Sequence, residues 1–121
     1  MEWKYQNFKP SEFNCPELMN PVLLSMLDRA RNALGEPIFI TSSYRSVLRN
    51  VVCGGVYDSS HTRGNAVDIR CSNGVYRFRL INALLEAGFT RIGVYEYHIH
   101  VDVESACHGK STPNLWVGKY K

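Results

Sequence analysis

The sequence predicts an α+β fold, in which helices cover one side of a small antiparallel sheet. Three observations support this prediction: two segments have apolar residues at helical spacing, two short runs are rich in β-branched residues, and a later segment alternates between polar and apolar residues. The chain has 121 residues, enough for one modest core, so we expect a single domain over residues 1–121.

The predicted helices are marked by capping residues as well as by periodicity. Asn20 suits the N-cap and Pro21 the first position of a helix that Gly35 ends. A second helical pattern covers residues 75–87. Its inward face is predicted to carry Ile81, Leu84 and Leu85. We also expect a short helix over residues 46–52, capped by its first serine.

The predicted strands cover residues 38–41, 66–71 and 91–103. The third is read as one long strand, because its residues alternate strictly between polar and apolar over most of its length. Period two then places four polar side chains on one face, and these are Glu96, His98, His100 and Asp102. Such a face is unlikely to be buried unless it lines a site. The tail from residue 105 is expected to be irregular.

The charge and the cysteine content limit which partners and which redox state we expect. Lys and Arg number 14 against 11 Asp and Glu, and the resulting charge of +3 is too small to indicate nucleic-acid binding but suits an anionic polymer such as a cell wall. No run reaches the roughly 18 apolar residues of a membrane-spanning helix, so we expect no membrane span. We also expect the protein to be a monomer. No secretory signal is visible, so we expect free thiols at Cys15, Cys53, Cys71 and Cys107.

Two segments combine histidines with carboxylates in a pattern that predicts a zinc site. His61 and Asp68 lie in the first segment, and His98 and His100 lie in the second. One histidine and one carboxylate from the first segment, with one histidine from the second, would give three protein ligands. A catalytic zinc ion has three such ligands and keeps its fourth position open for water. His61 and Asp68 are too far apart for one helical turn, so a loop must fold back between them, and Gly64 permits such a turn.

The first segment resembles a family signature. Ser59-Ser60-His61-x-x-Gly64-x-Ala66-x-Asp68 is similar to the S-x-H-x-x-G-x-A-x-D signature of the M15 zinc D-Ala-D-Ala carboxypeptidases and peptidoglycan endopeptidases, with Ser59 in the serine position. The resemblance implies one zinc ion per chain, held by His61, Asp68 and His100, and a fold shared with the Hedgehog N-terminal domain. It also implies that Ser59 contacts substrate or supports a ligand.

Two further runs extend the resemblance over nearly the whole chain. Residues 42–46, Ser-Ser-Tyr-Arg-Ser, resemble the S-G-Y-R-S element of the family, which implies that Arg45 binds substrate. Residues 8–15 resemble the opening of the small phage-type members. The implied partner is a peptidoglycan peptide. Because no signal peptide is visible, we expect synthesis in the cytoplasm and action on the cell wall after release, as an endolysin or another phage component.

One position departs from the family pattern. Many members place a catalytic carboxylate three residues before the distal histidine, and this position holds Tyr97. We expect Glu96 to be the general base, although an ideal strand would separate it from His100 by roughly 13 Å, so a bend at Tyr97 would be needed. Asp102 and Glu104 are the alternatives.

These residues lead to two hypotheses of function. In the first, the protein is a zinc peptidase of peptidoglycan, in which His98 donates a proton or steadies the oxyanion. In the second, it is a zinc-stabilised binding module without turnover, which the missing carboxylate at Tyr97 favours.

Overall fold

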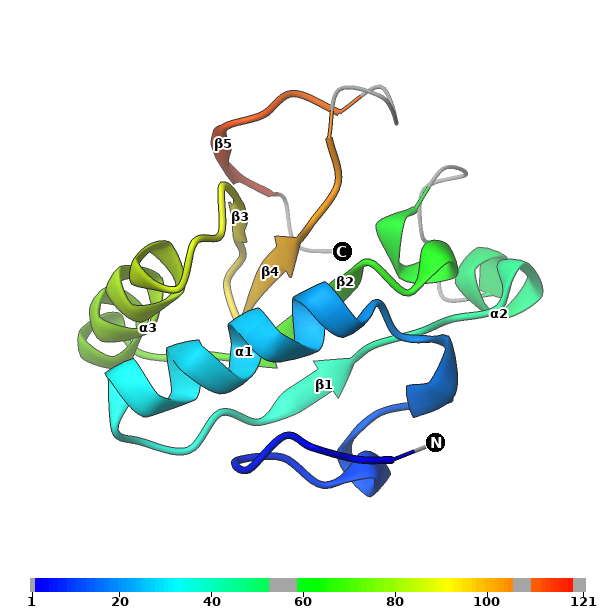
Figure 1. Ribbon diagram of the computed structural model, residues 1–121. Helices are drawn as coiled ribbons and strands as arrows, with labels where there is room; N and C mark the ends of the chain where they lie inside the picture. Colours follow the sequence, from blue (N-terminus) through cyan, green and yellow to red (C-terminus); the bar gives the residue numbers. More distant parts are fainter. Residues whose placement is uncertain (1, 53–58, 106–109, 119–121) are drawn as a thin grey trace.

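Helices separate the first three strands of one sheet along the chain, and the last three strands follow one another directly in the described residues (Figure 1). The computed structural model describes residues 2–52, 59–105 and 110–118. In these ranges the longer elements are α1 (Pro21–Leu34), β1 (Ile40–Ser42), α2 (Val47–Val52), β2 (Ala66–Arg70), α3 (Gly74–Glu86), β3 (Arg91–Val94), β4 (His98–Asp102) and β5 (Asn114–Val117). Short 3-10 helices are η1 (Pro10–Glu12), η2 (Pro16–Leu18) and η3 (Ser60–Arg63). The predicted α+β fold is confirmed.

The helix α1 begins and ends where its capping residues predict. The Asn20 side chain accepts a hydrogen bond from the Val22 amide at 2.9 Å, which satisfies one of the free N–H groups of the first turn. Gly35 ends the helix with φ of 73°, a conformation that glycine adopts without steric cost. The predicted short helix is also present as α2, and the Ser46 hydroxyl accepts from the Arg49 amide.

The sheet has the order β1-β2-β4-β3-β5 and is mixed. The first four strands pair antiparallel, but β5 pairs parallel with β3. Two expectations are therefore wrong. Residues 91–103 form two antiparallel strands joined by a turn at residues 95–97, not one long strand, and the tail adds an edge strand instead of staying irregular.

The core lies between one face of the sheet and the helices α1 and α3, which cover that face in Figure 1. The sheet contributes the apolar half of each strand's alternation, with Val67, Ile69, Ile92, Ile99 and Val101 all buried. The opposite face therefore carries the alternate residues, which include the histidines and carboxylates of β2 and β4.

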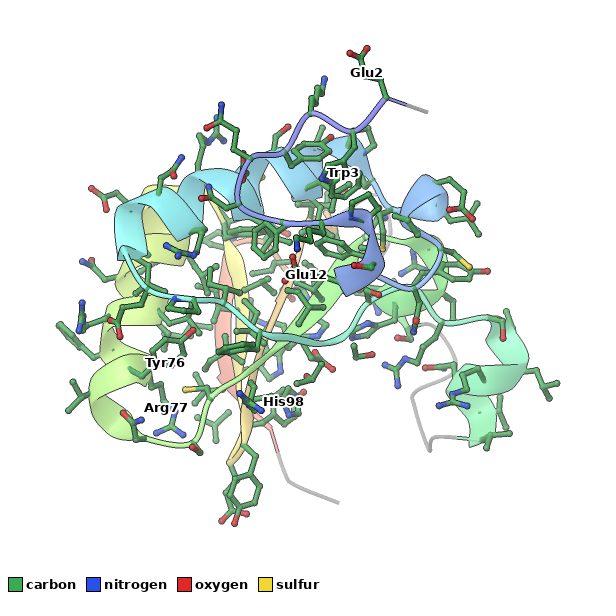
Figure 2. The ribbon with its side chains drawn as sticks, turned by 90° about the horizontal axis from the view of Figure 1, so that it is seen from below. Glu2, Trp3, Glu12, Tyr76, Arg77 and His98 are labelled. Carbon is green, nitrogen blue, oxygen red and sulfur yellow. The ribbon has the colours of Figure 1, made fainter. Side chains whose placement is uncertain are left out.

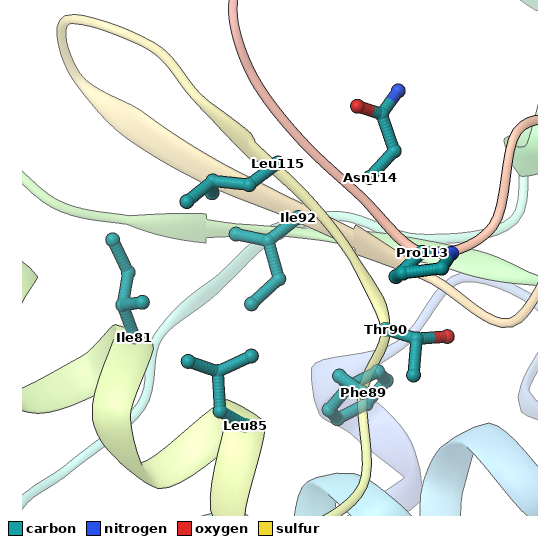
Figure 3. Close-up of a pocket in the computed structure, with 8 residues that line it drawn as sticks. All are labelled: Ile81, Leu85, Phe89, Thr90, Ile92, Pro113, Asn114 and Leu115. Atoms are coloured by element: carbon teal, nitrogen blue, oxygen red, sulfur yellow. The ribbon is translucent and has the colours of Figure 1, made fainter.

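The predicted inward face of α3 is rotated slightly. Leu84 is buried as expected, together with Leu80 and Ala83, but Leu85 is 54% exposed. Leu85 and Ile81 instead line an apolar hollow of about 400 Å³ between α3 and β5 (Figure 3). This hollow opens on the helix side of the sheet, so it is separate from the polar face.

Two smaller expectations concern cysteines and membranes. Among the described residues, Cys15 is exposed and Cys71 is buried, and neither is in a disulfide. Cys53 and Cys107 lie outside the described residues. No helix in the described ranges has the length and apolarity that a membrane crossing requires.

Candidate metal centre

The loop before β2 positions His61. Ser59 caps η3, and its hydroxyl accepts a hydrogen bond from the His61 amide at 3.2 Å. Gly64 then turns the chain with φ of 72°, and a Cβ there would lie 2.0 Å from the carbonyl oxygen of Leu18, so only glycine fits. The turn that the sequence predicted at Gly64 is confirmed. It leaves the His61 side chain buried, at 3% exposure.

A backbone carbonyl orients the His61 ring. The Nδ1 atom of His61 lies 2.8 Å from the carbonyl oxygen of Ser43. A carbonyl can only accept, so Nδ1 carries the proton and Nε2 keeps its lone pair. That lone pair points toward Asp68, whose Oδ1 is 3.3 Å from Nε2.

The pairing of β2 with β4 brings the other residues together. Asp68 stands directly opposite His100 in the antiparallel register, so both side chains leave the same face of the sheet. His100 Nδ1 lies 3.1 Å from Asp68 Oδ1. One ligand atom from each of His61, Asp68 and His100 lies within 4.8 Å of the other two.

The charges in this cluster support one another. Burial raises the pKa of Asp68, but its interactions with His100 and His61 outweigh this effect and hold the pKa well below its usual value. Burial lowers the pKa of His100, but hydrogen bonds to Asp102 and Asp68 outweigh this effect and raise the pKa to about 9. Asp68 is therefore a carboxylate over the whole physiological range.

Asp102 supports His100 from behind, and sequence reasoning did not assign it this role. The Nε2 atom of His100 donates to Asp102 Oδ2 at 2.7 Å. Asp102 Oδ1 in turn accepts from Arg91 Nε at 2.7 Å and from the Glu104 amide at 3.1 Å. A signal was available, because Asp102 lies two residues after His100 and so on the same strand face.

These residues fit a zinc ion. Two imidazole nitrogens and a carboxylate oxygen are a common zinc donor set, and tetrahedral bonds of about 2.0–2.1 Å place neighbouring donors roughly 3.3 Å apart. The 3.3 Å and 3.1 Å separations from Asp68 Oδ1 agree with this. The far nitrogen of each histidine meets a carbonyl or carboxylate, which is the usual outer support of metal-bound histidine.

His98 lies beside the cluster. Its Nε2 is 3.9 Å from Asp68 Oδ2, and its ring stacks on Tyr95 with centroids 4.4 Å apart and planes 9° apart. Burial lowers the pKa of His98, and the charges of nearby groups, Arg45 among them, modify this shift. Arg45 thus lies near enough to act electrostatically on the site.

The remaining predicted residues are placed as follows. Glu96 lies in the turn at residues 95–97 with an exposed side chain, so it does not share a strand face with His100 as expected. Its carbonyl accepts from Arg77. Glu104 is buried and bound by Arg63 and Asn65, which commits its carboxylate to a structural role.

Comparison with known protein families identifies the family of this chain. The sequence model of one protein family, Peptidase M15, matches residues 4–104 of the chain. The chain belongs to the Peptidase M15 family. The matched range contains the whole His61–Asp68–His100 cluster, and the resemblance inferred from the sequence is confirmed. No curated protein matches the chain. Membership of the Peptidase M15 family supports a peptidase, and the group of zinc-compatible donors is a set that could hold the metal of a metallopeptidase.

Proposed function

We propose that the protein is a zinc-dependent peptidase that hydrolyses peptide bonds in peptidoglycan stem peptides or cross-links, as a D,D-carboxypeptidase or an endopeptidase. The observation that supports this most strongly is the cluster of His61, Asp68 and His100, in which each histidine turns one nitrogen toward Asp68 and has the other bound by an acceptor. A zinc ion held there would supply Lewis-acid activation of water and of the scissile carbonyl.

Arg45 is proposed to bind a substrate carboxylate or carbonyl. Its amide donates to the His61 carbonyl at 3.1 Å, which fixes its backbone beside the metal centre. Its Nε is buried and has no hydrogen-bond partner among the residues that the structure describes. An unsatisfied guanidinium nitrogen is costly, and a carboxylate would satisfy it with bidentate geometry. Ser59 supports this site indirectly, because its hydroxyl holds the His61 amide.

His98 and Glu96 are proposed as the groups that assist catalysis. Among the described residues, His98 is the further histidine that lies beside the cluster, with Nε2 3.9 Å from Asp68 Oδ2. The Tyr95 ring stacks on it and fixes its plane, so it can donate a hydrogen bond to the developing oxyanion. Glu96 remains the proposed general base. Since its side chain is exposed in the turn, this role requires the turn to bring the carboxylate over the cluster when substrate binds.

The experiment combines metal content with turnover. The protein is purified without a metal-chelating tag, its zinc is quantified, and it is incubated with purified peptidoglycan while new fragments are followed by mass spectrometry. We expect one zinc ion per chain and cleavage that a chelator abolishes, and the fragment masses will identify the bond. A protein that still lacks zinc after reconstitution would refute the ligand assignment.

Two variants test the proposed roles. Glu96→Gln should keep its zinc and lose most turnover. Arg45→Lys should raise KM, because an ammonium group cannot copy the bidentate contact. Arg49→Lys on the exposed surface of α2 is the matched control and should leave both kinetic parameters unchanged.

A second function, a zinc-stabilised binding module without turnover, is favoured by one observation. The two carboxylates that follow His100 in sequence both have structural partners: Asp102 binds Arg91 and His100, and Glu104 binds Arg63. Neither is therefore placed to act as a general base. One zinc ion per chain, binding of muropeptides and no cleavage of several peptidoglycan types would support this function over the peptidase.

A further inference from the structure

The edge strand β5 lies beyond the part of the chain that the Peptidase M15 family model matches. The match ends at residue 104, whereas β5 covers Asn114–Val117 and adds to the sheet in parallel with β3. The register places Trp116 beside Gly93, and Gly93 stands opposite His100. One row of residues on the polar face of the sheet therefore runs from Asp68 through His100 and Gly93 to Trp116.

Gly93 gives the Trp116 ring its place. A Cβ at Gly93 would lie 2.6–2.7 Å from three atoms of the indole, closer than real Cβ contacts, so the ring lies directly on the glycine backbone. The neighbouring row repeats this arrangement. There the Tyr95 ring occupies the space where a Cβ at Gly118 would be, and the Tyr95 hydroxyl accepts from Trp116 Nε1 at 3.2 Å.

Trp116 also contacts His100, the proposed third ligand, and Arg91, which holds the carboxylate partner of His100. Its ring centroid is 5.6 Å from that of His100. The guanidinium carbon of Arg91 lies 4.8 Å from the indole centroid, in cation–π geometry. Arg91 binds Asp102, and Asp102 accepts from His100 Nε2. The indole thus packs on the ligand ring itself and on the cation that holds the ligand's carboxylate partner.

We propose that Trp116 is a positioning residue of the metal centre: together with Tyr95 it forms an aromatic wall, placed by β5, that fixes the orientation of the His100 imidazole. The inference rests on the proposed function, because it takes His100 as a metal ligand. It goes beyond that function, because it assigns the orientation of the ligand to a strand outside the family match.

The test measures metal binding with zinc and cobalt alone, without substrate. Zinc affinity is determined on metal-free protein by competition with a chromophoric chelator, and the visible spectrum of the cobalt-loaded protein reports the ligand geometry. The variants are Trp116→Ala, Trp116→Phe and Gly93→Ala. Val117→Ala is the matched control, because Val117 is the next residue of β5, is 84% exposed and lies on the other face of the sheet.

The variants separate positioning from folding. Trp116→Ala should weaken zinc binding about tenfold or more, within the range seen when outer partners of metal ligands are removed, and should alter the cobalt spectrum. Trp116→Phe keeps an aromatic ring on Gly93, although it loses the N–H and part of the indole area, so it should restore most of the affinity. Gly93→Ala keeps the tryptophan but displaces it, so it should reproduce the alanine variant. Thermal unfolding of each metal-free variant shows which of them fold.

Tryptophan fluorescence gives a second readout. The other tryptophan, Trp3, packs on Tyr5 and Phe13 in the N-terminal segment, and Figure 2 shows it well separated from His98. In a Trp3→Phe background, cobalt binding should quench the emission of Trp116 strongly. In a Trp116→Phe background, it should quench Trp3 much less.

Each outcome has one meaning. If the unaltered protein binds one zinc ion and every folded variant binds it with equal affinity and an unchanged cobalt spectrum, the positioning role is refuted while the proposed function stands. If variants lose only thermal stability, Trp116 is structural and the proposal is again refuted. If the unaltered protein binds no metal, the proposed function fails first.

Discussion

Replacement of Asp102 by asparagine tests how the proposed metal centre is held. Asp102 accepts from His100, Arg91 and the Glu104 amide at 2.7, 2.7 and 3.1 Å, and its side chain is 1% exposed. An asparagine has the same shape but only one accepting oxygen. If that oxygen stays with Arg91 and Glu104, the new NH₂ group faces the His100 N–H, which is also a donor. The reversed amide would face two donors instead of one, so the first orientation is preferred.

The conflict with His100 sets the expected magnitude. His100 can relieve it only by accepting at Nε2, which leaves its proton on Nδ1, the nitrogen that faces Asp68 and would bind zinc. We therefore expect Asp102→Asn to weaken zinc binding by 10- to 100-fold, or about 1.4–2.8 kcal/mol. The metal-free protein should also lose about 1–3 kcal/mol of its free energy of unfolding, because Arg91 loses a charged partner.

Chelator competition measures the first effect, and urea denaturation of the metal-free protein measures the second. Asp28→Asn is the control, because the Asp28 carboxylate also accepts several hydrogen bonds, from Gln6 and Asn7, but lies on α1. It should lower stability and leave zinc affinity unchanged. Equal zinc affinity in Asp102→Asn and the unaltered protein would refute the reasoning.

Three further predictions concern the frame around the site. Glu104→Gln should lower the free energy of unfolding by about 1–3 kcal/mol at neutral pH, because the buried carboxylate binds Arg63. Burial raises the pKa of the Glu104 carboxyl, but its hydrogen bonds, above all the one from Arg63, outweigh burial and leave that pKa lowered. The carboxylate therefore stabilises the fold fully above its ordinary pKa of 4.5, and this stabilisation is lost as the pH falls through the pKa of the folded state. Urea titrations should show the stabilities of Glu104→Gln and the unaltered protein converging in acid. Asn20→Ala should cost about 1 kcal/mol in the same assay through loss of the cap. Iodoacetamide should modify exposed Cys15 in the folded protein and spare Cys71, whose pKa burial raises, as peptide mass mapping will show.

Local signals predicted the parts of the molecule that depend on neighbours in sequence. The cap at Asn20 and the glycine at position 35 set the bounds of α1, and the segment from His61 to Asp68 carries its own turn at Gly64. The Ser43 carbonyl that orients His61 had no such signal, because any residue has a carbonyl and only the fold decides which one lies near.

The turn at residues 95–97 was missed for a definite reason. It consists of Tyr-Glu-Tyr, with none of the glycine, proline, asparagine or aspartate residues that usually mark a hairpin turn. Polar and apolar residues alternate on both sides of it, so the segment looks like one strand. The strand β5 was missed because its partner, β3, lies about 20 residues away in sequence, and its pairing depends on tertiary contacts.

The same turn both builds the support of the proposed metal centre and removes Glu96 from it. In one continuous strand, Arg91 and Asp102 would stand roughly 36 Å apart, whereas the hairpin places them next to the Ile92–Val101 pair and joins them by a 2.7 Å hydrogen bond. Folding back also places Gly93 opposite His100, which opens the position that Trp116 occupies. As a result, Glu96 lies at the tip of the hairpin and not on the strand face that carries His100. A catalytic role for Glu96 therefore requires the turn to move, whereas the proposed support of His100 requires the turn to be formed. Measurements of metal affinity and of turnover on the same variants separate these two requirements.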